Sequence, residues 1–203
     1  AANNMKKLTL ALITICVAAS AAMAAPAAKT KAKAEAPFKE YAMENGFFTC
    51  SIPSDWSVEH DADKDAEYKI YEIQLIAPKG DKAPVFIYVS YYAKDNEDFN
   101  NYEDFVRRNS RNVLGETRNK RELYETPKKI ELSGRKAVEL VRERMVYLHP
   151  ETKSDDSVQL KEKMYVLPAK EGFYVMHFSA PKAAFITNLK VFEKVAKSFK
   201  GKF

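Results

Sequence analysis

The chain has 203 residues, of which 46% are hydrophobic and 12% aromatic, and its formal net charge is +5. The hydrophobic fraction is ordinary for a globular protein. Lys6 and Lys7 contribute two of the five positive charges and residues 25–40 contribute two more, which leaves +1 for residues 41–203. Because the rest of the chain is nearly neutral and shows no alternation of basic and aromatic residues, its charge does not support binding to nucleic acid.

Residues 5–24 have the three parts of a secretory signal peptide. Two lysines follow Met5, residues 8–17 form an apolar run, and Ala22-Met23-Ala24 supplies the small residues of a cleavage site. The strongly apolar run is about half of the ~20 residues that a membrane-spanning helix needs. We leave the residues before Met5 out of this prediction.

The leader does not have the pattern of a lipoprotein signal. Ile15 precedes Cys16, where a lipoprotein signal requires a small residue. We therefore predict Sec-type cleavage near Ala24 and a periplasmic or secreted protein with no transmembrane segment in its mature chain.

Residues 25–37 are rich in Ala and Lys and contain no aromatic residue, so we expect a flexible mature N-terminus. Residues 38–203 suffice for one domain with its own core. After cleavage only Cys50 remains, which excludes an internal disulfide. Phe48, Cys50 and Ile52 share one side of a predicted strand, so we expect a buried thiol and a monomer rather than a dimer linked by an exposed thiol.

Turn signals divide most of the domain into short apolar runs. Glu44-Asn45-Gly46, Pro78-Lys79-Gly80-Asp81, Ser133-Gly134 and Lys170-Glu171-Gly172 mark the turns, and 59–67 reads as a charged loop. We predict strands over 47–52, 68–77, 85–92, 128–132, 135–149, 158–167 and 173–180. Short turns between successive strands imply antiparallel pairing.

Two amphipathic helices complete the prediction. Asn100 or Asn101 can cap the first, which carries one apolar stripe and ends at Gly115. The stripe consists of Tyr102, Phe105, Val106, Val113 and Leu114. Pro181 opens the second helix. Its apolar positions are Phe185, Leu189, Phe192, Val195, Ala196 and Phe199. We therefore predict an α+β single domain in which helices sandwich an antiparallel sheet.

Two segments resemble the PsbP-like family. Residues 46–56 read GFFTCSIPSDW, and residues 172–181 read GFYVMHFSAP. The first is similar to the F-x-(I/V)-x-(I/L)-P-x-x-W motif with which the family's domain begins. The second, followed by Phe192 and Ser198-Phe199, is similar to the family's last strand and helix. The family includes the extrinsic PsbP subunit of photosystem II, exported bacterial relatives and a Ran-binding nuclear-import factor. The resemblance implies an α/β/α fold and a non-enzymatic domain that docks on larger assemblies. It transfers no binding residue to this chain.

Asp61, Asp63, Asp65 and Glu72 occupy positions 1, 3, 5 and 12 of a calcium-loop spacing. Position 6, where the loop needs glycine, is Ala66, and the flanking residues read as strand. We therefore favour a solvated acidic loop and keep calcium as the alternative.

The histidines of this sequence do not indicate a metal site or a catalytic site. His60, His149 and His177 have no metal-ligand spacing among themselves. His177 and Ser179 share one face of a predicted strand, but no orienting acid or oxyanion hole is indicated. We predict a packed His177, no catalytic residue and no cofactor.

Charged residues are segregated along the middle of the chain. Residues 95–104 contain five acidic and no basic side chains, whereas residues 107–129 contain eight basic and three acidic ones. One interpretation is a solvated surface. The other is a docking patch for an acidic partner or an anionic envelope surface. The candidate docking residues are Arg107, Arg108, Arg111, Arg118 and Arg121.

These observations favour an exported, non-enzymatic accessory or docking protein of the bacterial cell envelope, with a protein partner and no nucleic acid. The alternative is a periplasmic small-molecule or lipid binder with a cavity between sheet and helix. An empty cavity of several hundred Å³ would favour the binder. A solid core beside a charged concave edge would favour docking.

Overall fold

A computed structural model describes residues 37–78 and 82–203. The predicted signal peptide at 5–24, the N-terminus up to residue 36 and positions 79–81 of one predicted turn lie outside the described residues. The described part from residue 37 onward belongs to one compact unit.

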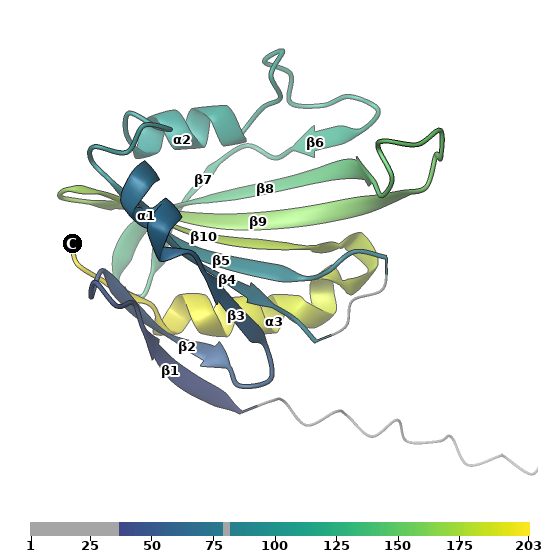
Figure 1. Cartoon of the computed structure of the whole chain (residues 1–203). Helices are drawn as coiled ribbons and strands as arrows, with labels where there is room; N and C mark the ends of the chain where they lie inside the picture. Colours follow the sequence, from purple (N-terminus) through teal and green to yellow (C-terminus); the bar gives the residue numbers. More distant parts are fainter. Residues whose placement is uncertain (1–36, 79–81) are drawn as a thin grey trace, which may run out of the picture. The chain divides into compact units, whose positions relative to one another are not determined.

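The main element of the fold is an antiparallel sheet in the order β3-β4-β5-β10-β9-β8-β6, with β7 also paired to β8 (Figure 1). Its strands are β3 (Ser57–His60), β4 (Ile70–Ile76), β5 (Phe86–Ala93), β6 (Glu122–Tyr124), β7 (Lys128–Leu132), β8 (Arg135–Tyr147), β9 (Ser157–Ala169) and β10 (Gly172–Pro181). Every pairing in this sheet is antiparallel, as predicted from the short turns.

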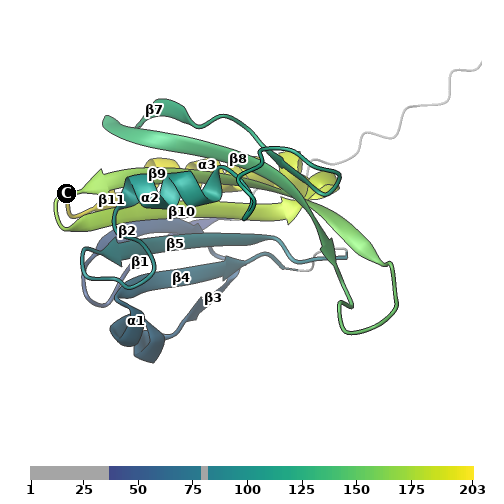
Figure 2. The same ribbon diagram turned by 90° about the horizontal axis from the view of Figure 1, so that it is seen from above.

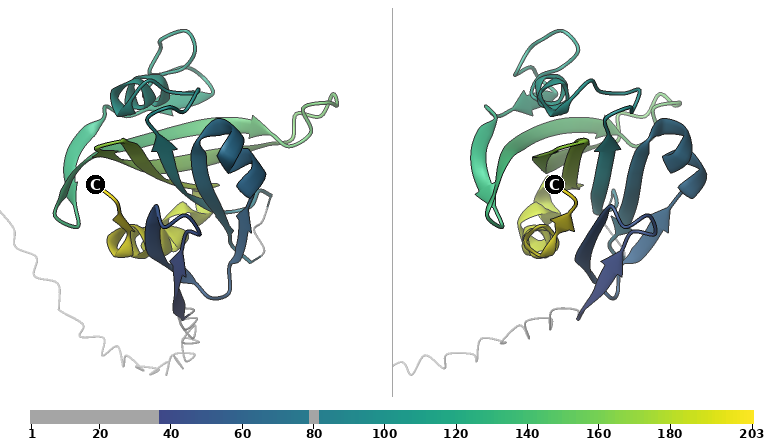
Figure 3. Two further views of the ribbon diagram at one scale, coloured as in Figure 1. Left: turned by 60° about the vertical axis from the view of Figure 1, so that its left-hand side comes forward. Right: turned by 90° about the vertical axis from the view of Figure 1, so that its left-hand side faces the viewer.

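A smaller antiparallel sheet and three helices surround the main sheet. The small sheet has the order β1-β2-β11. The remaining elements are β1 (Phe38–Ala42), β2 (Phe48–Pro53), β11 (Lys200–Gly201), α1 (Ala62–Tyr68), α2 (Tyr102–Asn109) and α3 (Lys182–Ser198). Figure 3 shows α2 on one face of the main sheet and α3 with the small sheet on the other, and Figure 2 gives the view onto α2. The predicted sandwich of helices around an antiparallel sheet is confirmed.

Strand β10 links the two hydrophobic cores because its side chains alternate between the two faces. Tyr174, Met176 and Phe178 point to the α3 side and belong to the larger core, whereas Phe173 and Val175 belong to a smaller core that includes α2. All five side chains are buried. Loss of β10 would therefore open both cores.

Aromatic rings fill the space between the main sheet and α3. Phe192 stacks on Phe178 at a centroid distance of 5.4 Å and on Tyr165 at 5.2 Å, and Phe185 lies 5.0 Å from Phe178. Cys50 is also buried in this core, as predicted, and burial raises the pKa of its thiol to about 12. A thiol in this environment behaves as a small apolar side chain.

Two hairpins have turn residues that match the required backbone geometry. Ser133 and Gly134 have φ values of +49° and +79°, the left-handed geometry of a two-residue turn between β7 and β8. Gly172, at the β9–β10 turn, has φ of +144°, and a Cβ there would lie 2.0 Å from the Tyr92 carbonyl oxygen. Glycine is therefore required at residue 172 both by conformation and by space.

The predicted helix over residues 102–114 is wrong in its second half. Helix α2 ends at Asn109, and the Ser110 hydroxyl donates to the Arg107 carbonyl at 3.2 Å. The Asn112 side-chain oxygen then accepts the N–H groups of Leu114 and Glu116, at 3.0 and 2.9 Å. Asparagine side chains compete with helical hydrogen bonds in this way, and the chain turns outward instead of continuing the apolar stripe.

The predicted charged loop at 59–67 is also wrong, because it contains the end of β3 and most of α1. The Asp61 side chain caps α1 by accepting the Lys64 N–H at 3.2 Å, and Lys69, with φ of +57°, ends the helix in the left-handed conformation. The following strand therefore begins at Ile70, two residues later than predicted. Helix α3 begins at Lys182, and Pro181 is its cap and the last residue of β10.

Candidate docking surface

Helix α2 is attached to the sheet through Phe105. Its ring lies 4.8 Å from Phe99 and 5.6 Å from both Tyr92 and Phe173, and Tyr92 stacks on Phe173 at 4.7 Å. Asn101 caps the helix by accepting the Asp104 N–H at 2.8 Å. Helices of this length are not stable alone in water. The aromatic contact therefore determines which side of α2 faces outward.

Asp104 holds two arginines at the C-terminal end of α2. This buried carboxylate pairs with Arg107 and with Arg108, whose Nη2 lies 2.7 Å from Oδ2. Arg108 also donates to the Asp98 carbonyl at 2.6 Å and lies over the Phe99 ring at 4.6 Å. The hydrogen bonds from Arg108 are the main cause that lowers the pKa of Asp104 to about 2. Since Asp104 stays ionised, one of these two positive charges remains without a counter-charge.

A hollow of about 650 Å³ lies between the end of α2, the following loop, β6 and β8. Arg107, Arg108, Arg111 and Arg142 line it from three different segments, together with Tyr124. The remaining lining residues are Asn112, Val113, Leu114, Gly115 and Glu122. The structure thus gathers three of the predicted docking residues around one basic concave edge.

A buried carboxylate on β9 fixes Arg142 beneath this hollow. Glu162 is fully buried and pairs with Arg142 and with Arg144, whose Nη2 lies 3.1 Å from Oε1. Arg142 also donates to the Asn109 side-chain oxygen at 3.1 Å, which connects the sheet to the end of α2.

Burial raises the pKa of Glu162, but His177, Arg142 and Arg144 outweigh this effect and hold it well below its usual range. The His177 Nε2 lies 3.5 Å from the Glu162 Oε1, and Tyr88 stacks on the imidazole at 5.6 Å. His177 therefore lies half-buried in a charged cluster on the sheet, and its contacts are with Glu162 and Tyr88 rather than with Ser179.

Arg118 and Arg121 lie beyond the hollow on the segment that leads into β6. Arg121 lies over the Tyr147 ring at 5.3 Å, and it lines a second hollow of about 600 Å³ that shares Glu122 with the first. In the part of the chain that the structure describes, Arg111, Arg118, Lys120 and Arg121 are exposed and none forms an ion pair within 4.0 Å. Figure 1 shows their segment along the same edge as α2 and β6.

The four calcium candidates line or border a cleft of about 850 Å³ beside α1, where each has another role. Asp61 caps α1, Asp65 lies 2.8 Å from His60 Nε2, and Glu72 accepts a hydrogen bond from Ser90 at 2.5 Å. Asp63 lies in the first turn of α1. Across residues 37–78 and 82–203, no group of three or more His, Cys, Asp and Glu side chains is placed to hold a metal ion. The helix replaces the loop geometry that calcium binding needs.

Asp104, Arg142 and Glu162 are parts of this surface that the sequence does not indicate as such. Arg142 and Glu162 meet through the register of β8 and β9, which no local motif encodes, whereas Asp104 pairs with Arg107 and Arg108 within α2, at spacings of three and four residues. Glu162 gives a partial signal in the sequence, because it is a charged residue on a face of β9 that otherwise carries Val158, Leu160, Met164 and Val166.

No helix in the described ranges combines the length and the apolar composition that a membrane crossing requires. No protein-family model matches the sequence, and no curated protein is significantly similar to it.

Solved structures with the same arrangement exist. The chain is similar to the cyanobacterial PsbP protein CyanoP from Synechocystis sp. PCC 6803, with 13% identity over 82% of this chain and 93% of that chain and a TM-score of 0.52. It also matches the Ran-binding protein Mog1p of Saccharomyces cerevisiae, with 11% identity over 82% and 96% of the two chains and a TM-score of 0.46. LpqN of Mycobacterium tuberculosis gives 14% identity over 82% and 86%, with a TM-score of 0.45. Because the last two scores are below 0.5, the assignment of the PsbP-like fold rests on CyanoP.

Glu162→Gln is expected to destabilise the protein by roughly 3 kcal/mol at pH 7, because the two arginines lose a buried counter-charge. The lowered pKa of Glu162 means that its stabilisation is complete above its ordinary pKa of 4.5 and is lost as the pH falls below that value. The difference from the wild type should therefore shrink between pH 4.5 and pH 2 in urea unfolding curves.

Glu171→Gln is the control, since that carboxylate is exposed and lies 3.9 Å from Lys94. Exposed pairs contribute about 1 kcal/mol or less. An equal deficit of Glu162→Gln at pH 7 and at pH 3 would contradict the electrostatic explanation.

Proposed function

On the basis of the PsbP-like fold, we propose that this chain is an exported, non-enzymatic accessory protein of the bacterial cell envelope that docks on an acidic partner. The observation that carries the proposal is the basic concave edge formed by Arg107, Arg108, Arg111 and Arg142. Arg118, Lys120 and Arg121 extend this edge with charges that make no ion pair among the described residues. We refer to these seven side chains as the arginine surface.

The charge arrangement supports docking rather than a solvated face. Asp104 and Glu162 neutralise only part of the charge, and they hold the guanidinium groups in fixed positions. A fixed, clustered positive charge attracts an acidic partner and accelerates its encounter. Arginine also forms bidentate hydrogen bonds with carboxylates and phosphates.

The packing of the larger core does not favour the alternative of a small-molecule or lipid binder between sheet and helix. Phe178, Phe185 and Phe192 fill that space, and each is at least 96% buried. A hollow of about 300 Å³ lies between the C-terminal end of α3 and the β7–β8 hairpin, but the larger hollows, of about 850 and 650 Å³, lie at charged edges of the sheet. This combination of a solid core and a charged concave edge is the arrangement expected for docking.

Export is the part of the proposal that rests on the leader at 5–24. When the full chain is expressed with its own leader in a bacterium, the protein recovered from the periplasm should begin at Ala25, as read by N-terminal sequencing or intact mass. Recovery of the chain only in the cytoplasm with Met5 retained would contradict export. Substituting Ala22 and Ala24 by bulky residues should block cleavage without affecting synthesis.

The docking role is tested by reversing the unpaired charges. The triple variant Arg111→Glu, Arg118→Glu and Arg121→Glu should associate with native envelope extract about tenfold more slowly at low salt, because it loses electrostatic attraction. Its association should also depend less on salt concentration. Biolayer interferometry at several salt concentrations measures both effects.

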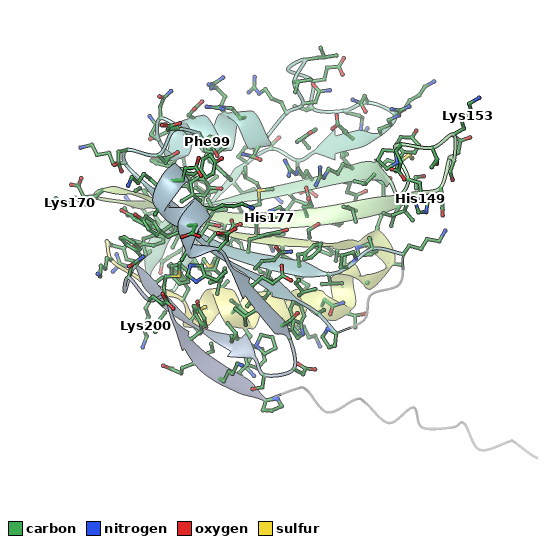
Figure 4. All side chains as sticks on the ribbon, in the orientation of Figure 1. Phe99, His149, Lys153, Lys170, His177 and Lys200 are labelled. Atoms are coloured by element: carbon green, nitrogen blue, oxygen red, sulfur yellow. The ribbon has the colours of Figure 1, made fainter. Side chains whose placement is uncertain are left out.

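The matched control reverses Lys153, Lys170 and Lys200, three exposed lysines on other parts of the domain (Figure 4). This control changes the net charge by the same amount and should retain the wild-type association rate. If both triple variants slow association equally, only net charge matters and the arginine surface is not the docking site.

A further inference from the structure

The loop after α2 exposes two adjacent apolar side chains. Val113 is 102% and Leu114 79% exposed relative to a reference extended chain, and they are the only neighbouring large apolar residues with such exposure among the described residues. Figure 1 shows this loop projecting from the edge that carries α2. Exposing Val and Leu side by side is unfavourable in water, so a contact that covers them would be favourable.

An ordered, hydrogen-bonded turn holds Val113 and Leu114 in this exposed position. The Asn112 side-chain oxygen accepts the N–H groups of Leu114 and Glu116, and its amide donates to the Glu116 carboxylate at 3.0 Å. The backbone adds two hydrogen bonds, from the Gly115 N–H to the Asn112 carbonyl at 3.0 Å and from the Asn112 N–H to the Glu116 carbonyl at 2.9 Å. Gly115 has φ of +82°, which closes the turn. Val113 and Leu114 therefore stand at the tip of an ordered loop, which we call the apolar tip.

The segment that carries the apolar tip is strongly basic. Residues 107–121 contain six basic side chains and one acidic one, Glu116. Glu116 is already hydrogen-bonded to Asn112, and the hollow behind the tip is lined by Arg107, Arg108 and Arg111. An apolar tip with positive charge at its base complements a surface that is negative outside and apolar below.

We propose that the apolar tip inserts into an anionic phospholipid bilayer while the arginines at its base bind lipid phosphates. This inference rests on the proposed docking function and specifies the surface on which the protein docks. A bilayer accepts a convex tip of any shape, whereas a protein partner would need a matching apolar pocket inside an acidic rim. Basic residues near an anionic leaflet each strengthen binding about fivefold, and the apolar side chains add depth of insertion.

The test uses vesicles of phosphatidylglycerol and phosphatidylethanolamine, with pure phosphatidylcholine vesicles as the neutral comparison. The mature wild-type protein should sediment with the anionic vesicles and not with the neutral ones. The double variant Val113→Ser and Leu114→Ser should weaken binding about tenfold or more, because it removes the inserted apolar surface. Both side chains are exposed, so the variant should retain the wild-type unfolding transition.

Ile186→Ser is the matched control, since Ile186 is 72% exposed on α3 and lies outside the loop. It should bind vesicles as the wild type does. A Leu114→Trp variant should in addition show a blue shift of its fluorescence on anionic vesicles, which reports entry into an apolar environment.

Two results would overturn the bilayer proposal. One is no sedimentation of the wild type with anionic vesicles, and the other is sedimentation that the double serine variant leaves unchanged. If association with native envelope extract still depends on Arg111, Arg118 and Arg121 in that case, docking remains and the partner is an acidic protein. If association with the extract does not depend on these three arginines either, the proposed docking function is contradicted as well.

Discussion

The contact of Phe105 with Phe173 is the interaction on which the candidate docking surface depends. Helix α2 has eight residues and needs the sheet for its stability. Because Phe105 packs into the small core with Phe99 and Phe173, the residues on the opposite side of the helix point away from the sheet. The positions of Arg107 and Arg108, and of the loop that follows them, are consequences of this apolar contact.

Ion pairing divides the basic residues around the end of α2 into two groups. Arg107, Arg108, Arg142 and Arg144 are held by Asp104 or Glu162, so they form a fixed frame with a small surplus of positive charge. Arg111, Arg118, Lys120 and Arg121 form no ion pair in the described part of the chain and keep their full charge. In the proposed docking, the fixed frame would cost little entropy on binding, and the unpaired group would supply the long-range attraction.

Much of the fold could be predicted from the sequence, because alternation and turn residues act locally. Ser133-Gly134 and Gly172 fix their hairpins by backbone geometry, and the apolar positions of α3 follow the helical period. The apolar stripe from Phe105 to Val113 and Leu114 predicts a helix that is too long. The Asn112 side chain competes for the backbone N–H groups that such a helix would need. Five arginines were recognised as a cluster from their density alone. Asp104 pairs with two of them, Arg107 and Arg108, at spacings of three and four residues within α2. Glu162 pairs instead with Arg142 and Arg144, which only the strand register of the folded chain brings to it.

Docking through the surface around the end of α2 can be tested by amide hydrogen exchange of the mature domain, with and without native envelope extract. If the protein docks there, exchange should slow over residues 105–124 in the presence of the extract and stay unchanged in the acidic cleft around α1 and in α3. Protection of the acidic cleft or α3 instead, or no protection anywhere, would contradict docking through this surface.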